Sequence, residues 1–116
     1  MRLIGIDSPE VRDPRTPMEC FGREASARAT ELMESSEVWL EYDDTQGRRD
    51  RYNRLLAYVW LDASTLVNEV LVSEGFAYEY THNAPYKYRD SFQEVEQSAK
   101  KAGRGLWQDP ACSARR

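Results

Sequence analysis

Two stretches with the character of β-strands, joined by a long polar link, restrict the folds open to this chain. Residues 54–61 are rich in Leu, Tyr, Val and Trp. Residues 37–42 alternate between two sides of the chain, with Val38, Leu40 and Tyr42 on one side and Glu37, Trp39 and Glu41 on the other. The link at 43–53 carries many charges and contains Gly47. Alternation with a period of two is typical of a strand with one buried face. The pattern predicts an antiparallel hairpin with a long loop.

Three helices are predicted around this hairpin. Apolar residues recur at three- and four-residue steps over 19–35 and over 90–102, where Gly103 ends the second pattern. A shorter apolar pattern at 66–71 is closed by Gly75, which suits a left-handed position after the last helical turn. We therefore expect an α+β fold.

The remaining segments give weaker signals. Residues 1–6 are predicted as the end of a buried strand, and the proline-containing stretch 11–18 as a loop. Residues 78–88 are aromatic and irregular, and at least two of their tyrosines are expected to serve packing. We expect three tryptophans to be buried at least in part: Trp39, Trp60 and Trp107.

Length and composition fit one domain over residues 1–116. The chain is 41% hydrophobic and 31% charged, which argues against disorder. No apolar run reaches membrane-spanning length, and no signal peptide is visible after Met1. Cys20 and Cys112 are a reduced pair or a single disulfide, and the sequence leaves both open. A lone His82 argues against a histidine-based site.

The net charge of −4 excludes nucleic-acid binding by bulk charge alone, so such binding needs a local patch. Four arginines in the polar link could form one: Arg48, Arg49, Arg51 and Arg54. The alternative is a solvated, salt-bridged hairpin, because Asp43, Asp44 and Asp50 are interleaved with them. On charge alone we favour this alternative for Arg48 and Arg49.

Two arginines and two carboxylates match the needs of phosphodiester cleavage: Arg2, Asp7, Glu10 and Arg54. Carboxylates hold a hard cation and take a proton from water, while guanidinium groups bind the charge that builds on a phosphate. Taken singly, each has a simpler explanation. Asp7 could cap a turn, Glu10 could be solvated, and Arg54 could pair with Asp50 or Glu41. Only the joint pattern favours catalysis.

Five dispersed segments resemble the staphylococcal nuclease (thermonuclease) family over essentially the whole chain: RLIGIDSPE (2–10), CFGREAS (20–26), DRYNRLLAYV (50–59), LVNE (66–69) and AKKAGRGLW (99–107). The resemblance implies an OB-fold, a five-stranded barrel with three helices. It also implies a calcium-dependent nuclease acting on DNA and RNA with little sequence preference. Family members are often exported, which favours a secreted or cell-envelope protein.

Position by position, the resemblance assigns Asp7 and the Ser8 carbonyl as Ca²⁺ ligands and Glu10 as the general base. Arg2 and Arg54 match the arginines that stabilise the transition state. Arginine suits both places because its planar fork binds two phosphate oxygens at once.

The resemblance assigns less at two other places. Tyr80 and Tyr88 are our choices for substrate contact, among four tyrosines that do not align uniquely. Asn53 stands where relatives commonly have Gly, and Asn tolerates the positive φ that the turn needs.

Relatives carry further strands, with another Asp ligand, ahead of the segment that matches Met1–Ile6. The resemblance thus implies an OB barrel that is incomplete at its N-terminus. The chain could be truncated, could obtain strands from a partner or a second copy, or could fold as a rearranged open sheet. We expect a homo-oligomer, because an exposed strand edge is a pairing template. The alternative function is a catalytically impaired module that binds nucleic acid or a protein.

Overall fold

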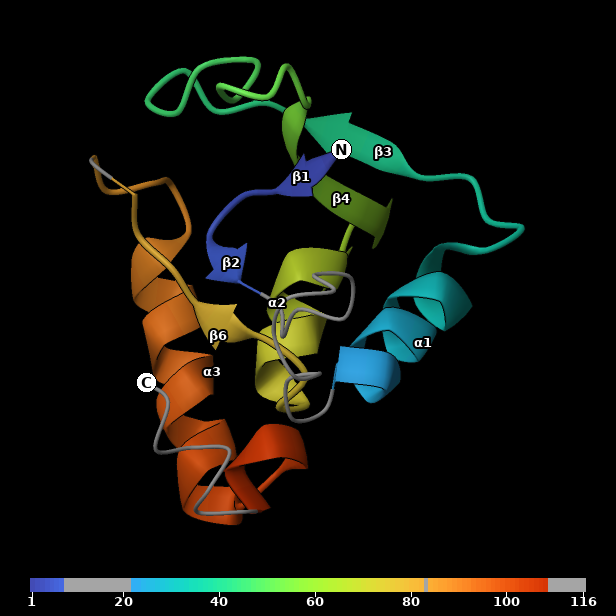
Figure 1. The fold of residues 1–116 in the computed structure, drawn as a ribbon, viewed down its shortest axis with the longest axis vertical. Coiled ribbons are helices and arrows are strands. Elements are labelled where there is room, and N and C mark those ends of the chain that lie inside the picture. Colours follow the sequence, from blue (N-terminus) through green and yellow to red (C-terminus); the bar gives the residue numbers. More distant parts are fainter. Residues whose placement is uncertain (8–21, 83, 109–116) are drawn as a thin grey trace, which may run out of the picture.

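A computed structural model describes residues 1–7, 22–82 and 84–108 of the chain. Its strands form two small sheets: a four-stranded sheet around the long central strand β4, and a separate pair of short strands, β2 and β6 (Figure 1). β1 pairs with β4 in parallel, β3 and β5 pair with β4 antiparallel, and β2 pairs antiparallel with β6. The described strands do not close into a barrel. Their bounds are β1 Arg2–Leu3, β2 Ile6–Asp7, β3 Trp39–Glu41, β4 Leu56–Asp62, β5 Thr65–Leu66 and β6 Tyr78–Glu79.

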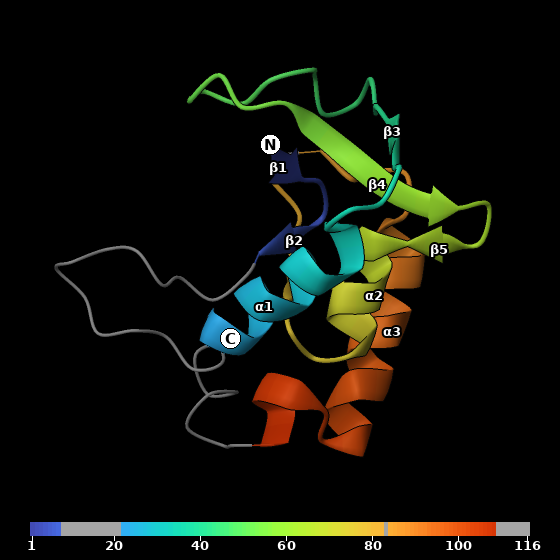
Figure 2. The same ribbon diagram turned by 90° about the vertical axis from the view of Figure 1, so that its right-hand side faces the viewer.

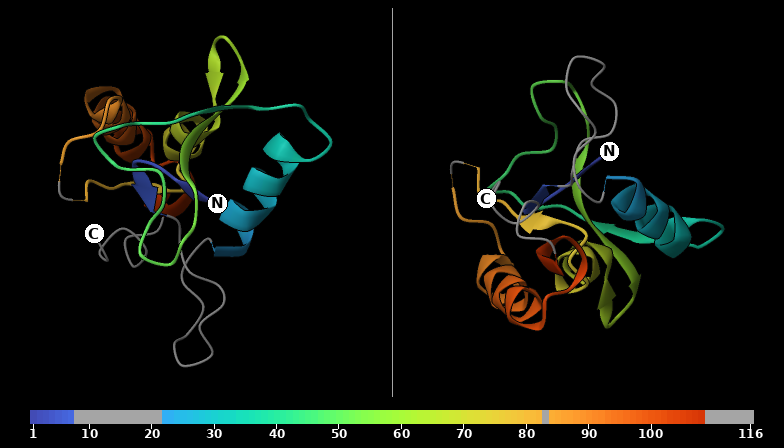
Figure 3. Two further views of the ribbon diagram at one scale, coloured as in Figure 1. Left: turned by 90° about the horizontal axis from the view of Figure 1, so that it is seen from above. Right: turned by 60° about the horizontal axis from the view of Figure 1, so that its bottom comes forward.

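The helices lie together below this sheet, as Figure 2 shows from the side. The described α-helices are α1 (Gly22–Met33), α2 (Val67–Ser73) and α3 (Arg89–Ala102), and a 3₁₀ turn, η1 (Gly105–Gln108), follows α3. α2 lies between α1 and α3, which the view from above confirms (Figure 3). The fold is α+β, as the sequence predicts. No helix in the described ranges is both long and apolar enough to cross a membrane.

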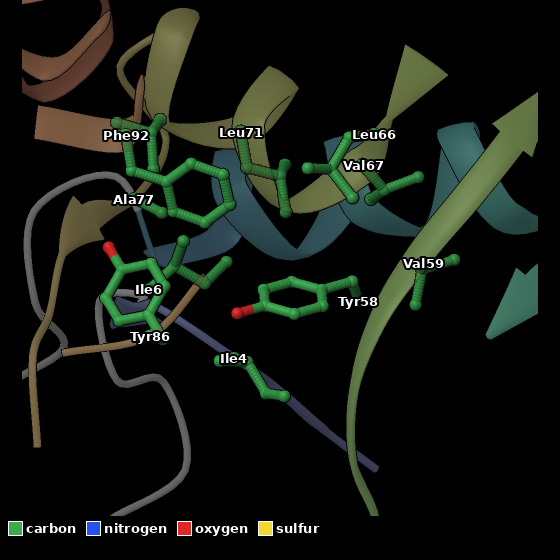
Figure 4. Close-up of a cluster of buried hydrophobic side chains, with 11 residues drawn as sticks. Ile4, Ile6, Tyr58, Val59, Leu66, Val67, Leu71, Ala77, Tyr86 and Phe92 are labelled. Atoms are coloured by element: carbon green, nitrogen blue, oxygen red, sulfur yellow. The ribbon is translucent and has the colours of Figure 1, made fainter. Parts of the chain in front are cut away.

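The core lies where β4 meets α2 and α3 (Figure 4). Tyr58 and Val59 of β4, Val67 of α2 and Phe92 of α3 are fully buried. Ile6 of β2, which precedes the helices in the sequence, packs in the same cluster. Each such side chain contributes about 1.5–3 kcal/mol when it leaves water, so this cluster fixes how the strands sit on the helices.

Several predicted features are confirmed. The hairpin forms as β3 and β4, with Leu40 opposite Val59. Gly75 and Gly103 follow α2 and α3 with φ angles of 81° and 64°, the left-handed conformation expected there. Trp107 is partly buried, as expected.

Two predictions are wrong. Residues 1–6 do not form a single strand end, because Gly5, with a φ of 84°, turns the chain between β1 and β2. Trp39 is 58% exposed rather than buried. The reason is its place in β3, which lies at an edge of the described sheet. By contrast Trp60, on the central strand, is partly buried.

Candidate active site

The parallel pairing of β1 with β4 brings Arg2 to the segment that carries Arg54. The backbone N–H of Arg2 donates to the carbonyl of Leu55 at 2.7 Å, and the Cα atom of Arg2 lies opposite that of Leu56. Side chains two residues apart on an extended chain share a face, so Arg54 and Leu56 point to the same side. Arg2 therefore lies on the face of the sheet that Arg54 also occupies.

A tight turn holds Arg54. One carboxylate oxygen of Asp50 accepts the N–H groups of Tyr52 and Arg54, both at 2.9 Å, and the other accepts the Arg54 Nε at 2.7 Å. Asn53 adopts the predicted positive φ, at 63°. Burial raises the pKa of Asp50, but these hydrogen bonds outweigh it and lower the pKa. The expected pairing with Asp50 thus exists, and it leaves the Arg54 side chain 48% exposed.

Tyr80 also lies next to Arg2, although the two residues are far apart in the sequence. Its backbone N–H donates to the carbonyl of Gly5 at 2.8 Å, and the Arg2 Cζ lies 5.9 Å from the centroid of its ring. Its hydroxyl lies 3.3 Å from Nδ1 of His82, and the two rings are stacked. The structure therefore brings Tyr80, one of the two predicted tyrosines, to Arg2.

Asp7 ends β2, just beyond the Gly5 turn that follows Arg2. It is partly buried and lies opposite Tyr78 of β6. Ser8 and Glu10, the expected carbonyl ligand and general base, fall outside the described residues, and so do Cys20 and Cys112.

A metal site cannot be assembled from the described ranges alone. They contain no group of three or more His, Cys, Asp or Glu side chains that could hold an ion. Asp7 offers the hard oxygen that Ca²⁺ prefers, and it is the one expected ligand within these ranges. The residues present thus fit part of the expected ligand set.

Tyr88 lies in a different environment. Its hydroxyl donates to Glu41 at 2.7 Å, and its ring meets Tyr58 edge-on at 4.7 Å. Glu41 also accepts from Trp60 at 2.9 Å and from Lys87 at 2.6 Å. These contacts join β3 and β4 to the start of α3. They tie Tyr88 to this junction rather than to Arg2, and its contact with substrate stays a prediction.

Tyr52 is a candidate that the sequence reasoning missed. It is 65% exposed, and the Cζ atoms of Arg51 and Arg54 lie 5.1 and 5.3 Å from its ring centroid. An exposed aromatic ring flanked by guanidinium groups offers a stacking surface for a base next to donors for phosphate. The sequence feature that could have indicated Tyr52 is its position among the arginines of the polar link.

These residues define a class of site. Guanidinium groups from two segments share one face, a carboxylate follows one of them, and two tyrosine rings stand alongside, Tyr80 partly buried and Tyr52 exposed. Such a site suits a phosphate-containing, base-bearing ligand.

Comparison with known proteins gives the family. The profile described as "Staphylococcal nuclease homologue" matches residues 1–109, and the chain belongs to this family. It is 37% identical over 107 residues to a thermonuclease of Staphylococcus hyicus, covering 92% of this chain and 62% of that protein. It is 40% and 39% identical to the SPbeta prophage-derived endonuclease YokF and the endonuclease YncB of Bacillus subtilis, each over 108 residues and 92% of this chain. The chain spans 36% of YokF and 50% of YncB.

Proposed function

We propose that this chain hydrolyses phosphodiester bonds of DNA or RNA with little sequence preference. The observation that carries the proposal is the pairing of β1 with the start of β4, which sets Arg2 and Arg54 on one face. Two guanidinium groups on one phosphate would bind its equatorial oxygens and stabilise the charge that develops there. Relatives named thermonuclease and endonuclease support the same reaction class.

The remaining roles follow the family resemblance. Glu10 is proposed as the general base that takes a proton from the attacking water. Asp7 and the carbonyl of Ser8 are proposed to hold Ca²⁺, which when bound would supply positive charge beside the phosphate. Tyr80, and Tyr52 with it, would stack on bases next to the cleaved bond. Tyr88 is a weaker choice for the same role, given its contacts with Glu41 and Tyr58.

A digestion assay tests the reaction. Purified chain is incubated with single-stranded DNA and with RNA, with Ca²⁺ or with a chelator. Arg54→Ala and Glu10→Gln are each expected to lower the cleavage rate by about 100-fold or more, because each removes a group that acts in the transition state. Arg23→Ala, at an exposed position on α1, is the control of equal charge change and should leave the rate unchanged.

Two outcomes separate the alternatives. Equal cleavage by the chain and all three variants would point to a contaminant or another site and would contradict the proposal. Binding of DNA without cleavage, weakened in Arg54→Ala, would favour the module that binds nucleic acid but lacks catalysis.

A further inference from the structure

The loop between β3 and β4 places a third arginine beside Arg2 and Arg54. Residues 48–50 run antiparallel to residues 54–56. The Asp50 N–H donates to the Arg54 carbonyl at 3.0 Å, and the Leu56 N–H donates to the Arg48 carbonyl at 2.9 Å. Between these two hydrogen bonds, the backbones of Arg49 and Leu55 form an antiparallel β-bridge.

This register assigns the two neighbouring arginines to opposite faces. Arg48 lies opposite Leu56, and Leu56 is also the partner of Arg2 on its other side. Side chains of directly opposed residues point to the same face, and successive ones alternate. Arg48 therefore shares the face of Arg2 and Arg54, whereas Arg49 points to the other face.

The side-chain contacts of the two arginines differ in the same way. Arg49 donates from Nη1 to the carbonyl of Asn53 at 2.9 Å, within the turn. Arg48 is exposed, and its Cζ lies 4.2 Å from the centroid of the Tyr42 ring. Among the described residues Arg48 makes no ion pair. The interpretation favoured from the sequence thus holds for Arg48 in its exposure to solvent, but none of the ion pairs among the described residues includes it.

A guanidinium held on an aromatic face is well suited to bind phosphate. The ring restrains the long side chain, while the N–H donors lie in the guanidinium plane and point away around its edge. The backbones of Arg2 and Arg48 flank β4 and are two strand spacings apart, about 10 Å. At this separation, Arg48 would bind a phosphate next to the one assigned to Arg2 and Arg54 and not the same phosphate.

We propose that Arg48, held by Tyr42, binds a second backbone phosphate of a single-stranded nucleic acid and so makes the chain favour longer strands over short ones. The inference rests on the proposed function, because it extends the same substrate path. It concerns binding alone, so it can be measured without cleavage.

The test compares a thymidine dinucleotide with an oligothymidylate of about eight nucleotides, a length that one OB-type domain can cover. Binding is followed by fluorescence anisotropy with a chelator present. Arg48→Ala is expected to weaken the longer strand about tenfold and to leave the dinucleotide within twofold. The slope of log affinity against log salt should fall by about 0.7, the value for one lost phosphate contact on a single strand.

Arg49→Ala is the matched control, because it removes the same charge from the adjacent position on the other face. It should leave the affinity of both strands within twofold. Tyr42→Phe should keep the affinity of the parent chain, and Tyr42→Leu should lose part of it, since only the first retains a ring under Arg48. Arg48→Gln serves as a second variant should Arg48→Ala unfold.

Equal losses in Arg48→Ala and Arg49→Ala, or an equal loss for the dinucleotide and the longer strand, would overturn the inference and leave the proposed function standing. A chain that binds neither strand and cleaves no DNA or RNA would overturn both.

Discussion

Asp43 ties the long loop between β3 and β4 to the rest of the molecule. Its carboxylate accepts the Tyr58 hydroxyl at 2.6 Å, the Lys87 N–H at 2.9 Å, and the N–H and hydroxyl of Thr45 at 3.0 and 2.7 Å. Burial raises the pKa of this group, but the hydrogen bonds outweigh it and lower the pKa from 3.8 to about 2. The loop that carries Arg48 and Arg54 is therefore anchored by a buried ion.

We predict that Asp43→Asn lowers the free energy of unfolding by about 2 kcal/mol near neutral pH. Because the folded pKa lies below the unfolded one, the charge stabilises the fold fully above about pH 4, and this stability is lost as the pH falls to about 2. The difference between the chain and the variant should shrink over that window. Urea unfolding at a series of pH values measures it.

Asp44→Asn is the control, because Asp44 is the exposed neighbour. A pH-independent difference for Asp43→Asn, or the same loss in Asp44→Asn, would contradict the assignment.

For single residues, the sequence predicted the structure where a residue type tolerates an unusual backbone conformation. Asn53 was expected to take a positive φ, and it does. Tyr52 was missed, and Arg48 was assigned to the solvated, salt-bridged alternative, because the role of each depends on which side chains it contacts across the loop, and spacing alone does not give this.

Among the elements, the turn that joins β1 to β2 positions both Arg2 and Asp7. The carbonyl of Gly5 accepts the Tyr80 N–H at 2.8 Å and the buried Tyr86 hydroxyl at 3.2 Å. Its backbone packs so closely that a Cβ atom would lie 2.5 Å from Cε2 of Tyr86 and 2.8 Å from Cε2 of Phe92. The turn thus needs glycine for two reasons, its φ and its space.

We predict that Gly5→Ala lowers the free energy of unfolding by about 3 kcal/mol, because strain at positive φ adds to overpacking of the core. Gly47→Ala is the matched control: Gly47 also has a positive φ, 76°, but nothing lies within 4 Å of a Cβ there. It should cost about 1 kcal/mol. Chemical denaturation of both variants gives the comparison, and equal costs would show that the close packing at Gly5 carries no penalty.

Elements with a long periodic pattern could be predicted, and short ones could not. The apolar stripe of α3 and its closing Gly103 gave that helix nearly to its ends. β2 and β6 have two residues each, too few for a period to show, and they pair across a large sequence separation. The proximity of Arg2 and Arg54 was expected from the family resemblance, because no local pattern encodes a parallel pairing.

At the scale of the whole molecule, the sheet presents an apolar edge. Trp39 and Leu40 of β3 are 58% and 39% exposed, and Val38 beside them is 36% exposed. Edge strands with exposed apolar side chains are templates for pairing with another chain.

We predict that the chain self-associates through this edge, with a sedimentation coefficient that rises with concentration. Trp39→Ser should shift the equilibrium to the monomer. Tyr52→Ser, which removes a similarly exposed ring away from the edge, should not. A monomer at every concentration, or equal effects of the two substitutions, would rule out association through β3.

The central claim is that Arg2 and Arg54 act on one phosphate, and a double-mutant cycle on kcat/KM tests it most directly. Arg2→Ala and Arg54→Ala should each lower kcat/KM for cleavage by about 100-fold or more. The double variant should lose far less than the product of the two, because residues that act as a unit are not additive. Losses that multiply, or a single variant with unchanged kcat/KM, would contradict the account.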